Sequence, residues 1–151
     1  MEKESWIFSN NIQRNDGVFM INVDMDSHSE ILGFIEAYLT QNVIQKNRHS
    51  VSNGGGNAAA AAAAAGHPAS YTVAIRGVQK FNVTDNLFGN PGLDYELLAG
   101  ITTARISNFL NAEQNYWGSP DINVVRERIF DFDDWNSYAI AHFVPYYLQN
   151  R

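Results

Sequence analysis

The sequence predicts an all-β fold, a solenoid of about four rungs, and three observations lead to it. First, a motif recurs in which a small or apolar residue is followed three positions later by asparagine. Second, the copies are spaced at intervals that suit solenoid repeats. Third, the segments between copies are short runs of β-branched and aromatic residues broken by Asn, Asp and Gly, typical of strands joined by turns. The four copies are Ile12–Asn15, Ile44–Asn47, Leu87–Asn90 and Ala112–Asn115.

The motif spacing predicts a repeating unit of about 25 residues once one insertion is set aside. The step from Leu87 to Ala112 is 25 residues, whereas the steps from Ile12 to Ile44 and from Ile44 to Leu87 are 32 and 43. The longest step contains residues 53–69, a low-complexity insertion with three consecutive glycines and eight consecutive alanines. Removing it leaves about 26 residues, inside the roughly 20–45 residues of solenoid repeats.

Units of this kind predict a parallel β-helix in which one asparagine of each rung stacks on the next. The first motif position suits an inward side chain, and the asparagine suits a turn because it tolerates left-handed backbone dihedrals. Stacked asparagines can pass amide hydrogen bonds from rung to rung. The alternative is that each asparagine marks an independent turn. The predicted ladder consists of Asn15, Asn47, Asn90 and Asn115.

Composition narrows the class of protein and its partners. At 151 residues, with 45% hydrophobic and 17% charged residues, the chain fits one globular domain. A net charge of −6 without a basic patch argues against a nucleic-acid partner, and no apolar run reaches the roughly 18 residues of a membrane span. There is no cysteine and the four histidines are isolated, so we expect no disulfide, no metal site and no cofactor.

The rungs are predicted to occupy residues 1–118. In the first rung, Asp24 and Asp26 alternate onto one face, as a catalytic or calcium-binding pair would. The positions opposite them on the third rung fall near residues 99–101, which offer no further acid, so solvated strand ends are the better interpretation. Periodicity does not decide between strand and helix for residues 31–39. The four predicted rungs are residues 6–26, 27–52, 70–92 and 93–118.

Residues 119–151 are predicted to form a cap that closes the stack. Trp117 and Gly118 lead into it, with Trp117 sealing the last rung. Ser119 suits a helix N-cap and Pro120 the first helical position. Apolar residues then recur at helical spacing, at Ile122, Val125 and Ile129.

Three acids and a final strand follow this short helix. The acids suit a bound cation, but calcium loops usually carry a glycine and a more distant glutamate. We therefore expect a solvated turn in which Phe132 and Trp135 are buried, followed by a strand over residues 138–144. The three acids are Asp131, Asp133 and Asp134.

The C-terminal segments resemble the closing part of right-handed parallel β-helix domains of the pectin-lyase-like class. The resemblance lies in residues 115–120, 128–131 and 143–148. More narrowly, residues 71–148 resemble the β-helix region of the Bark beetle (Anakonda) family of tricellular junction proteins. The resemblance implies that this chain is related to large single-pass membrane proteins with extracellular β-helix and scavenger-receptor modules. The scavenger-receptor cysteines and the membrane span are absent from this chain, so the resemblance implies a junction role only for a piece of a larger protein.

Three functional hypotheses follow. The first is a non-catalytic extracellular β-helix module of a cell-adhesion or cell-junction scaffold at the plasma membrane, whose partners are other junction proteins or the rest of its parent chain. The sequon at Asn82, a possible N-glycosylation site, agrees with it. The second is a carbohydrate-binding or polysaccharide-degrading enzyme, a lyase or glycoside hydrolase. The third is an inert fragment without its N-terminal rungs. The best acids for the enzyme are Asp24, Asp26, Asp85 and Asp94.

Overall fold

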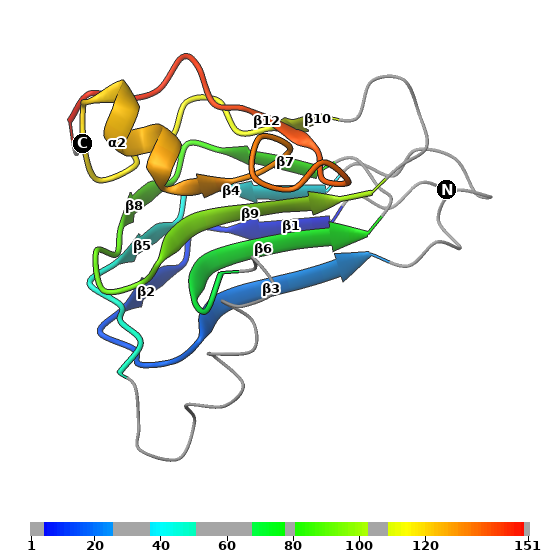
Figure 1. Ribbon diagram of the computed structural model, residues 1–151. Coiled ribbons are helices and arrows are strands. Elements are labelled where there is room, and N and C mark those ends of the chain that lie inside the picture. Colours follow the sequence, from blue (N-terminus) through cyan, green and yellow to red (C-terminus); the bar gives the residue numbers. More distant parts are fainter. Residues whose placement is uncertain (1–4, 26–36, 51–67, 78–80, 103–108, 150–151) are drawn as a thin grey trace.

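The computed structural model describes residues 5–25, 37–50, 68–77, 81–102 and 109–149. Within these ranges the strands form three parallel sheets, and one short helix lies near the C-terminal end (Figure 1). The five-stranded sheet contains β1 (Ser5–Phe8), β4 (Ala37–Thr40), β7 (Phe81–Thr84), β10 (Phe109–Asn111) and β12 (Ile140–His142). The three-stranded sheet contains β2 (Asn11–Gln13), β5 (Val43–Gln45) and β8 (Leu87–Gly89). The four-stranded sheet contains β3 (Phe19–Met25), β6 (Tyr71–Gly77), β9 (Tyr95–Ile101) and β11 (Ile129–Phe130).

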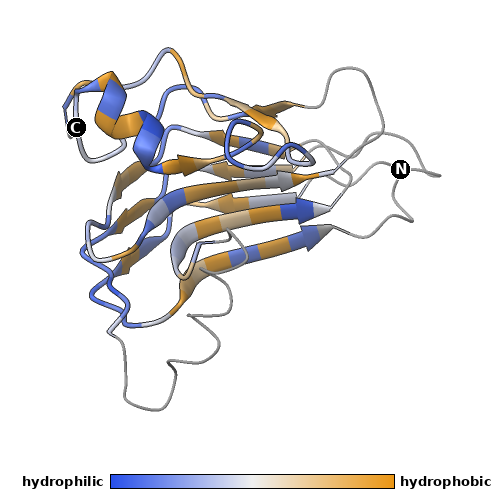
Figure 2. Ribbon diagram, in the orientation of Figure 1, coloured by the Kyte–Doolittle hydropathy of each residue, from blue (hydrophilic) through white to orange (hydrophobic). Residues whose placement is uncertain are grey.

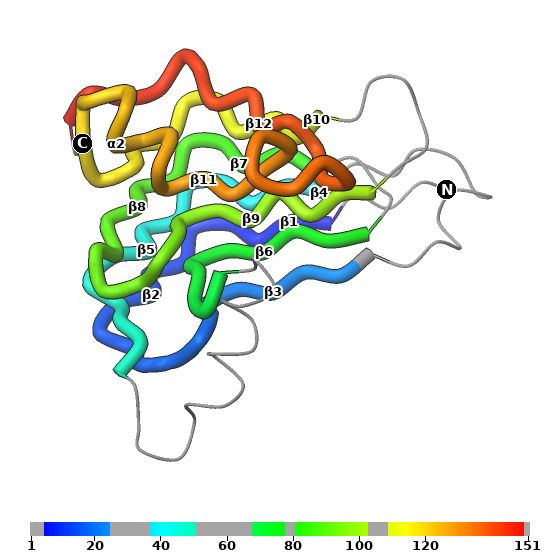
Figure 3. Tube along the Cα trace, in the orientation of Figure 1, coloured from blue at the N-terminus to red at the C-terminus, as the bar shows by residue number. Residues whose placement is uncertain are grey.

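The chain passes through the three sheets in a fixed order and then returns to the first. We call each such passage a coil. Coil 1 is β1–β2–β3, coil 2 is β4–β5–β6 and coil 3 is β7–β8–β9; coil 4 starts with β10 and ends with β11 (Figures 1 and 3). Every strand of coils 1 and 2 therefore pairs in parallel with the equivalent strand of the next coil. In the five-stranded sheet, for example, Ser5 is in register with Ala37 and Ala37 with Phe81.

Alternation along the strands places one set of apolar side chains between the sheets. The bands of hydrophobic residues along the strands are visible in Figure 2. In β4, β7 and β10 the inward residues are Leu39, Val83 and Leu110, all fully buried. Inward residues of β6 and β9 pack against them in the same cluster. The core is thus a column that runs through all four coils.

A second, smaller apolar cluster lies apart from this core. It comprises side chains of the four-stranded sheet that are buried by residues following β11. Phe130 meets Tyr95 and Tyr138 edge to face, with ring centroids 5.3 and 6.0 Å apart. Trp135 packs against the same cluster and is half-buried. The segment after β11 therefore shields part of this sheet.

The predicted cap contains the expected helix and strand, with different boundaries. Helix α2 spans Ile122–Glu127, and its N-cap is Asp121, whose carboxylate accepts the N–H of Asn123. The expectation of Ser119 at this position was wrong, because its hydroxyl instead accepts the N–H of Asp121, two residues later and still before the helix. None of the helices in the described part of the chain is long and apolar enough to cross a membrane.

The turn after α2 also differs from the expectation. Phe132 is 44% exposed, whereas Asp131, expected to be solvated, is only 8% exposed. The Asp131 carboxylate accepts the backbone N–H groups of Asp133 and Ala141, and so ties the turn to β12. Burial raises the pKa of Asp131 above its usual value. Asp131 therefore acts as a hydrogen-bond acceptor that stabilises the turn.

Candidate functional site: two polar ladders and a C-terminal pocket

Two ladders of hydrogen-bonded side chains flank the three-stranded sheet. In both ladders, the backbone N–H and the Nδ2 of one asparagine donate to the side-chain oxygen of the equivalent asparagine in the next coil; only at the end of one ladder does the last asparagine, Asn90, donate to a glutamate of its own coil. We call them the first and the second ladder. The first ladder is Asn10, Asn42, Asn86 and Asn115, with donor–acceptor distances of 2.9–3.1 Å. The second is Asn15, Asn47, Asn90 and then Glu96, with distances of 2.8–3.0 Å.

Each ladder amide also holds the backbone. Asn86 illustrates the pattern: its Nδ2 donates to Leu39 O of the preceding coil, to Thr84 O of its own turn and to Asn115 Oδ1 of the next coil. Its Oδ1 accepts both donors of Asn42. Because Asn86 is fully buried, water cannot reach its amide, and these bonds satisfy its donors and acceptor instead. One side chain thus fixes the spacing of three coils.

The predicted ladder combined members of both observed ladders. The structure joins Asn15, Asn47 and Asn90 in succession, but Asn115 belongs to the first ladder, with Asn86 as its donor. The physical reason is that the first ladder lies after the five-stranded sheet and the second after the three-stranded sheet, and Asn115 follows β10 of the five-stranded sheet. The inward residue of β8 is Phe88, fully buried, and not the predicted Leu87.

The asparagines themselves do not take the left-handed backbone conformation that the sequence suggested. In six of the described turns the residue immediately before the ladder asparagine takes it, with φ between 54° and 60°. A side chain at such a dihedral costs of order 1–3 kcal/mol and persists only where the surroundings enforce it. The ladder bonds supply that enforcement. The six residues are Ser9, Arg14, Gln41, Lys46, Asp85 and Gln114.

The second ladder ends in a buried ion pair. Glu96, fully buried in β9, accepts the N–H and Nδ2 of Asn90, the Thr72 hydroxyl at 3.3 Å and Nη2 of Arg128 at 3.1 Å. Arg128, just after α2, also donates to the carbonyl oxygens of Leu93, Asp94 and Asn90. Burial raises the pKa of Glu96 above its usual value, against the opposing effect of its donors. A carboxylate has no N–H to pass on, so Glu96 terminates the ladder.

The residues predicted to seal the last coil form a compact unit. Trp117 is 2% exposed and stacks on Phe88, with ring centroids 4.9 Å apart. Gly118 takes φ +88°, a conformation that side chains rarely adopt. The hydroxyl of Tyr146 donates to Pro120 O at 2.8 Å and so binds the C-terminal segment to this turn.

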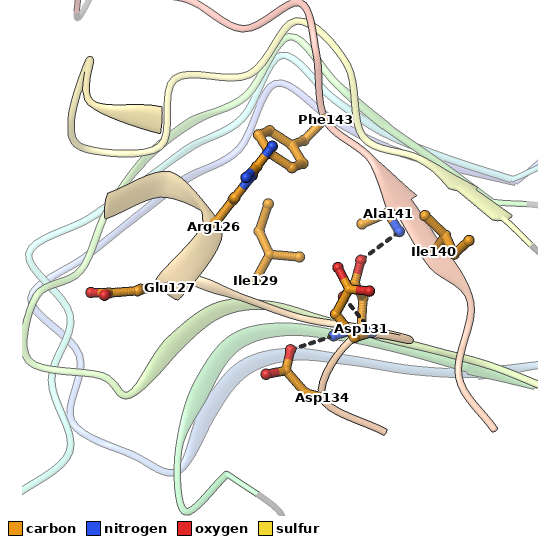
Figure 4. A pocket seen from close by; sticks show the side chains of 9 residues that line it. Arg126, Glu127, Ile129, Asp131, Asp134, Ile140, Ala141 and Phe143 are labelled. Carbon is orange, nitrogen blue, oxygen red and sulfur yellow. Dashed lines mark hydrogen bonds between the residues drawn. The ribbon is translucent and has the colours of Figure 1, made fainter. Parts of the chain in front are cut away.

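A pocket of about 510 Å³ lies between α2, β11, β12 and the turn that follows β11 (Figure 4). The apolar lining consists of Ile129, Ile140, Ala141 and Phe143. The polar lining consists of Arg126, Glu127, Asp131, Asp133 and Asp134. Two of these carboxylates already accept backbone N–H groups, namely Asp131 from Ala141 and Asp134 from Asp131. Much of the polar lining is therefore committed to holding the turn.

The three described acids of the enzyme hypothesis, Asp24, Asp85 and Asp94, do not line this pocket. In the four-stranded sheet Asp24 is in register with Arg76, and Arg76 with Gly100, as the sequence predicted. Asp94 precedes the same sheet at its other end, six residues from Gly100, which corresponds to about 20 Å along a strand. Asp85 lies in the turn between β7 and β8 and accepts the hydroxyl of Tyr147 at 2.7 Å. Asp26 lies outside the described residues.

Asn82, the sequon asparagine, lies in the middle of β7. It is half-buried, its Oδ1 accepts Nδ2 of Asn111 at 3.0 Å, and its own Nδ2 reaches Ala37 O only at 3.5 Å. Among the described residues no group of three or more His, Cys, Asp or Glu side chains is placed to hold a metal ion.

Comparison with known proteins gives one informative relative. No family model matches the chain, and no solved structure matches it. Over 155 aligned residues the chain is 28% identical to Protein bark beetle of Drosophila melanogaster, an alignment that covers 99% of this chain but only 5% of that protein. The chain is thus similar, along nearly its whole length, to a small part of a much longer protein, with which it shares weak homology.

Proposed function

We propose that the coils form a right-handed parallel β-helix that serves as a non-catalytic extracellular module of a cell-junction scaffold protein. The observation that carries the proposal is the alignment with Protein bark beetle, because it extends over 99% of this chain. The family resemblance supplies the junction role and the extracellular location.

The chemistry of the ladders supports a structural role. The polar side chains of the two ladders are asparagines and one ion pair, all hydrogen-bonded to each other or to the backbone. Such groups order the coils but leave no reactive atom facing a substrate. Of the acids considered for an enzyme, the three that the structure describes, Asp24, Asp85 and Asp94, lie in different parts of the fold, which supports a non-catalytic role. In this proposal the parent protein binds other junction proteins through surfaces that the coils hold in place.

The test is to characterise the native product in its own cells. An antibody against this chain should detect a product far larger than 16.9 kDa, recovered with membranes and labelled on intact cells by a reagent that does not cross membranes. Expression of the parent protein with Asn82→Gln should remove one glycan from the fragment that contains residue 82. A product protected from the reagent in intact cells would contradict the proposal, and turnover of polysaccharides by the purified chain would contradict its non-catalytic part.

A further inference from the structure

Coil 1 leaves one end of the stack uncovered among the residues that the structure describes. Its strands β1, β2 and β3 are the outermost strands of all three sheets. Four large apolar side chains of this coil are 44–55% exposed: Trp6, Phe8, Val18 and Phe19. The equivalent positions in coil 2 are better covered; Tyr71, in register with Phe19, is 8% exposed. Unpaired strand edges beside exposed apolar residues mark a surface that another β segment can extend.

Two aromatic columns also end there with one ring face open. Trp6 stacks on Tyr38 with centroids 4.2 Å apart, and Phe19 stacks on Tyr71 with centroids 6.0 Å apart. In each pair the coil 2 ring covers one face of the coil 1 ring. A further coil with an apolar or aromatic residue in each column would cover the second face.

The ladders give this end a chemical polarity. In every step from one asparagine to the next, the donors belong to the earlier coil and the acceptor oxygen to the later one. At the uncovered end, Asn10 and Asn15 use their donors toward Asn42 and Asn47. No described residue donates to Asn10 Oδ1 or to Asn15 Oδ1. Both residues are exposed, so these two oxygens can each accept the backbone N–H and the Nδ2 of an asparagine in a further coil.

The same polarity argues against a second copy as the occupant. Two copies meeting by their uncovered ends would bring Asn10 and Asn15 oxygens against identical oxygens, with no donor between them. Stacking of the uncovered end on the other end is opposed by the cap. There the second ladder ends in Glu96 and Arg128, and the backbone around Asn115 is bonded to the C-terminal segment, with Tyr147 N–H donating to Asn115 O.

We propose that the coil 1 end is an interface for one further parallel coil of the same, longer polypeptide, which carries asparagine at both corners of its short central strand. The much greater length of the similar Drosophila protein, of which this chain spans 5%, makes such a polypeptide the natural source. This proposal concerns coil stacking and does not rest on the junction role.

The test uses a coil of known sequence. A second copy of residues 81–109 is joined directly before Ser5, so that its ladder asparagines fall in register with Asn10 and Asn15. The copy carries Glu96→Thr, the residue type that Thr72 supplies in coil 2, so that the donors of its second ladder asparagine are not taken by a carboxylate of its own coil. The copied segment contains no tryptophan, so the fluorescence of Trp6 still reports on the interface. We expect the thermal midpoint to rise by roughly 4–10 °C, as a few kcal/mol would produce in a chain of this size. We also expect iodide quenching of tryptophan to fall, because Trp6 becomes covered.

A matched control carries the same extension with both copied ladder asparagines replaced by aspartate, which places carboxylates against the two free oxygens. This control should lose most of the gain in thermal midpoint, and iodide should still quench its tryptophan fluorescence as in the unextended chain. Equal gains in both extended chains, or unchanged quenching in the first, would overturn the proposal. Hydrogen exchange and sedimentation of the unextended chain give an independent test. We expect a monomer in which outward-facing amides of β1–β3 exchange faster than those of β7–β9; a dimer with protected β1–β3 amides would identify a second copy as the occupant and overturn it.

Discussion

The substitution Asn86→Ala tests whether the first ladder holds the coils together. The change removes five hydrogen bonds from a fully buried site. Its largest consequence falls on the backbone N–H of Asn42, which is 1% exposed and loses its acceptor. An orphaned buried group costs about 1–3 kcal/mol, and the weakened carbonyl and amide contacts add about 1–2 kcal/mol. We therefore expect a loss of about 2–5 kcal/mol, a large part of the roughly 5–15 kcal/mol that stabilises a typical domain.

Urea unfolding followed by circular dichroism measures the effect, and the midpoint should fall by roughly 1–3 M urea. Asn10→Ala is the matched control, because it alters the same residue type at the same corner of coil 1. Asn10 is exposed and its Oδ1 accepts no bond from a described residue, so we expect a loss of about 1 kcal/mol or less. If the two variants lose the same stability, the ladder does not act through buried bonds and the reasoning fails.

Three further predictions concern the second ladder, the cap and the coil spacing. Burial raises the pKa of Glu96 in the folded state, so the native carboxyl binds a proton more readily than the unfolded one. The stability of the wild type relative to Glu96→Gln should therefore increase as pH falls from about 7.5 to about 4.5. A flat or decreasing difference would show that the effect of Arg128 on this pKa outweighs the effect of burial. Asp121→Ala removes the N-cap bond of α2 and should cost about 0.5–1 kcal/mol in urea unfolding, with an unchanged midpoint as the contrary result. Gly92→Ala would place a Cβ 2.8 Å from the Cβ of Arg48 and should cost about 1–3 kcal/mol, whereas Gly89→Ala makes only ordinary contacts at 3.5 Å and should change the thermal midpoint little.

Much of the parallel-strand architecture could be predicted from the sequence, because strand-like runs, turn residues and asparagines recur in the same order in each repeat. The pattern did not distinguish the two corners of the short sheet. Ile7–Asn10, Leu39–Asn42 and Val83–Asn86 carry the same spacing as the motif that was followed, so Asn115 could be placed on either ladder. Only strand register, which depends on contacts between coils, assigns Asn115 to Asn86.

The termination of the second ladder could not be predicted from local sequence. A glutamate in a strand ordinarily indicates an exposed position, and Glu96 precedes its partner Arg128 by 32 residues. Its burial becomes favourable only when the chain returns after α2 and places a guanidinium against it. The burial of Asp131 has a similar origin, because its acceptor role depends on Ala141, ten residues later in β12.

The corners of the coils differ in their freedom to change length. The corner that carries the first ladder has two residues between strands in every complete coil: Ser9–Asn10, Gln41–Asn42 and Asp85–Asn86. The next corner contains residues 14–18 in coil 1, 46–70 in coil 2 and 90–94 in coil 3. A residue inserted at the first corner would displace an asparagine from its column, whereas the second corner already holds segments of very different length. Over evolution, new loops and peptide grafts in the laboratory should therefore be tolerated at the second corner and rejected at the first.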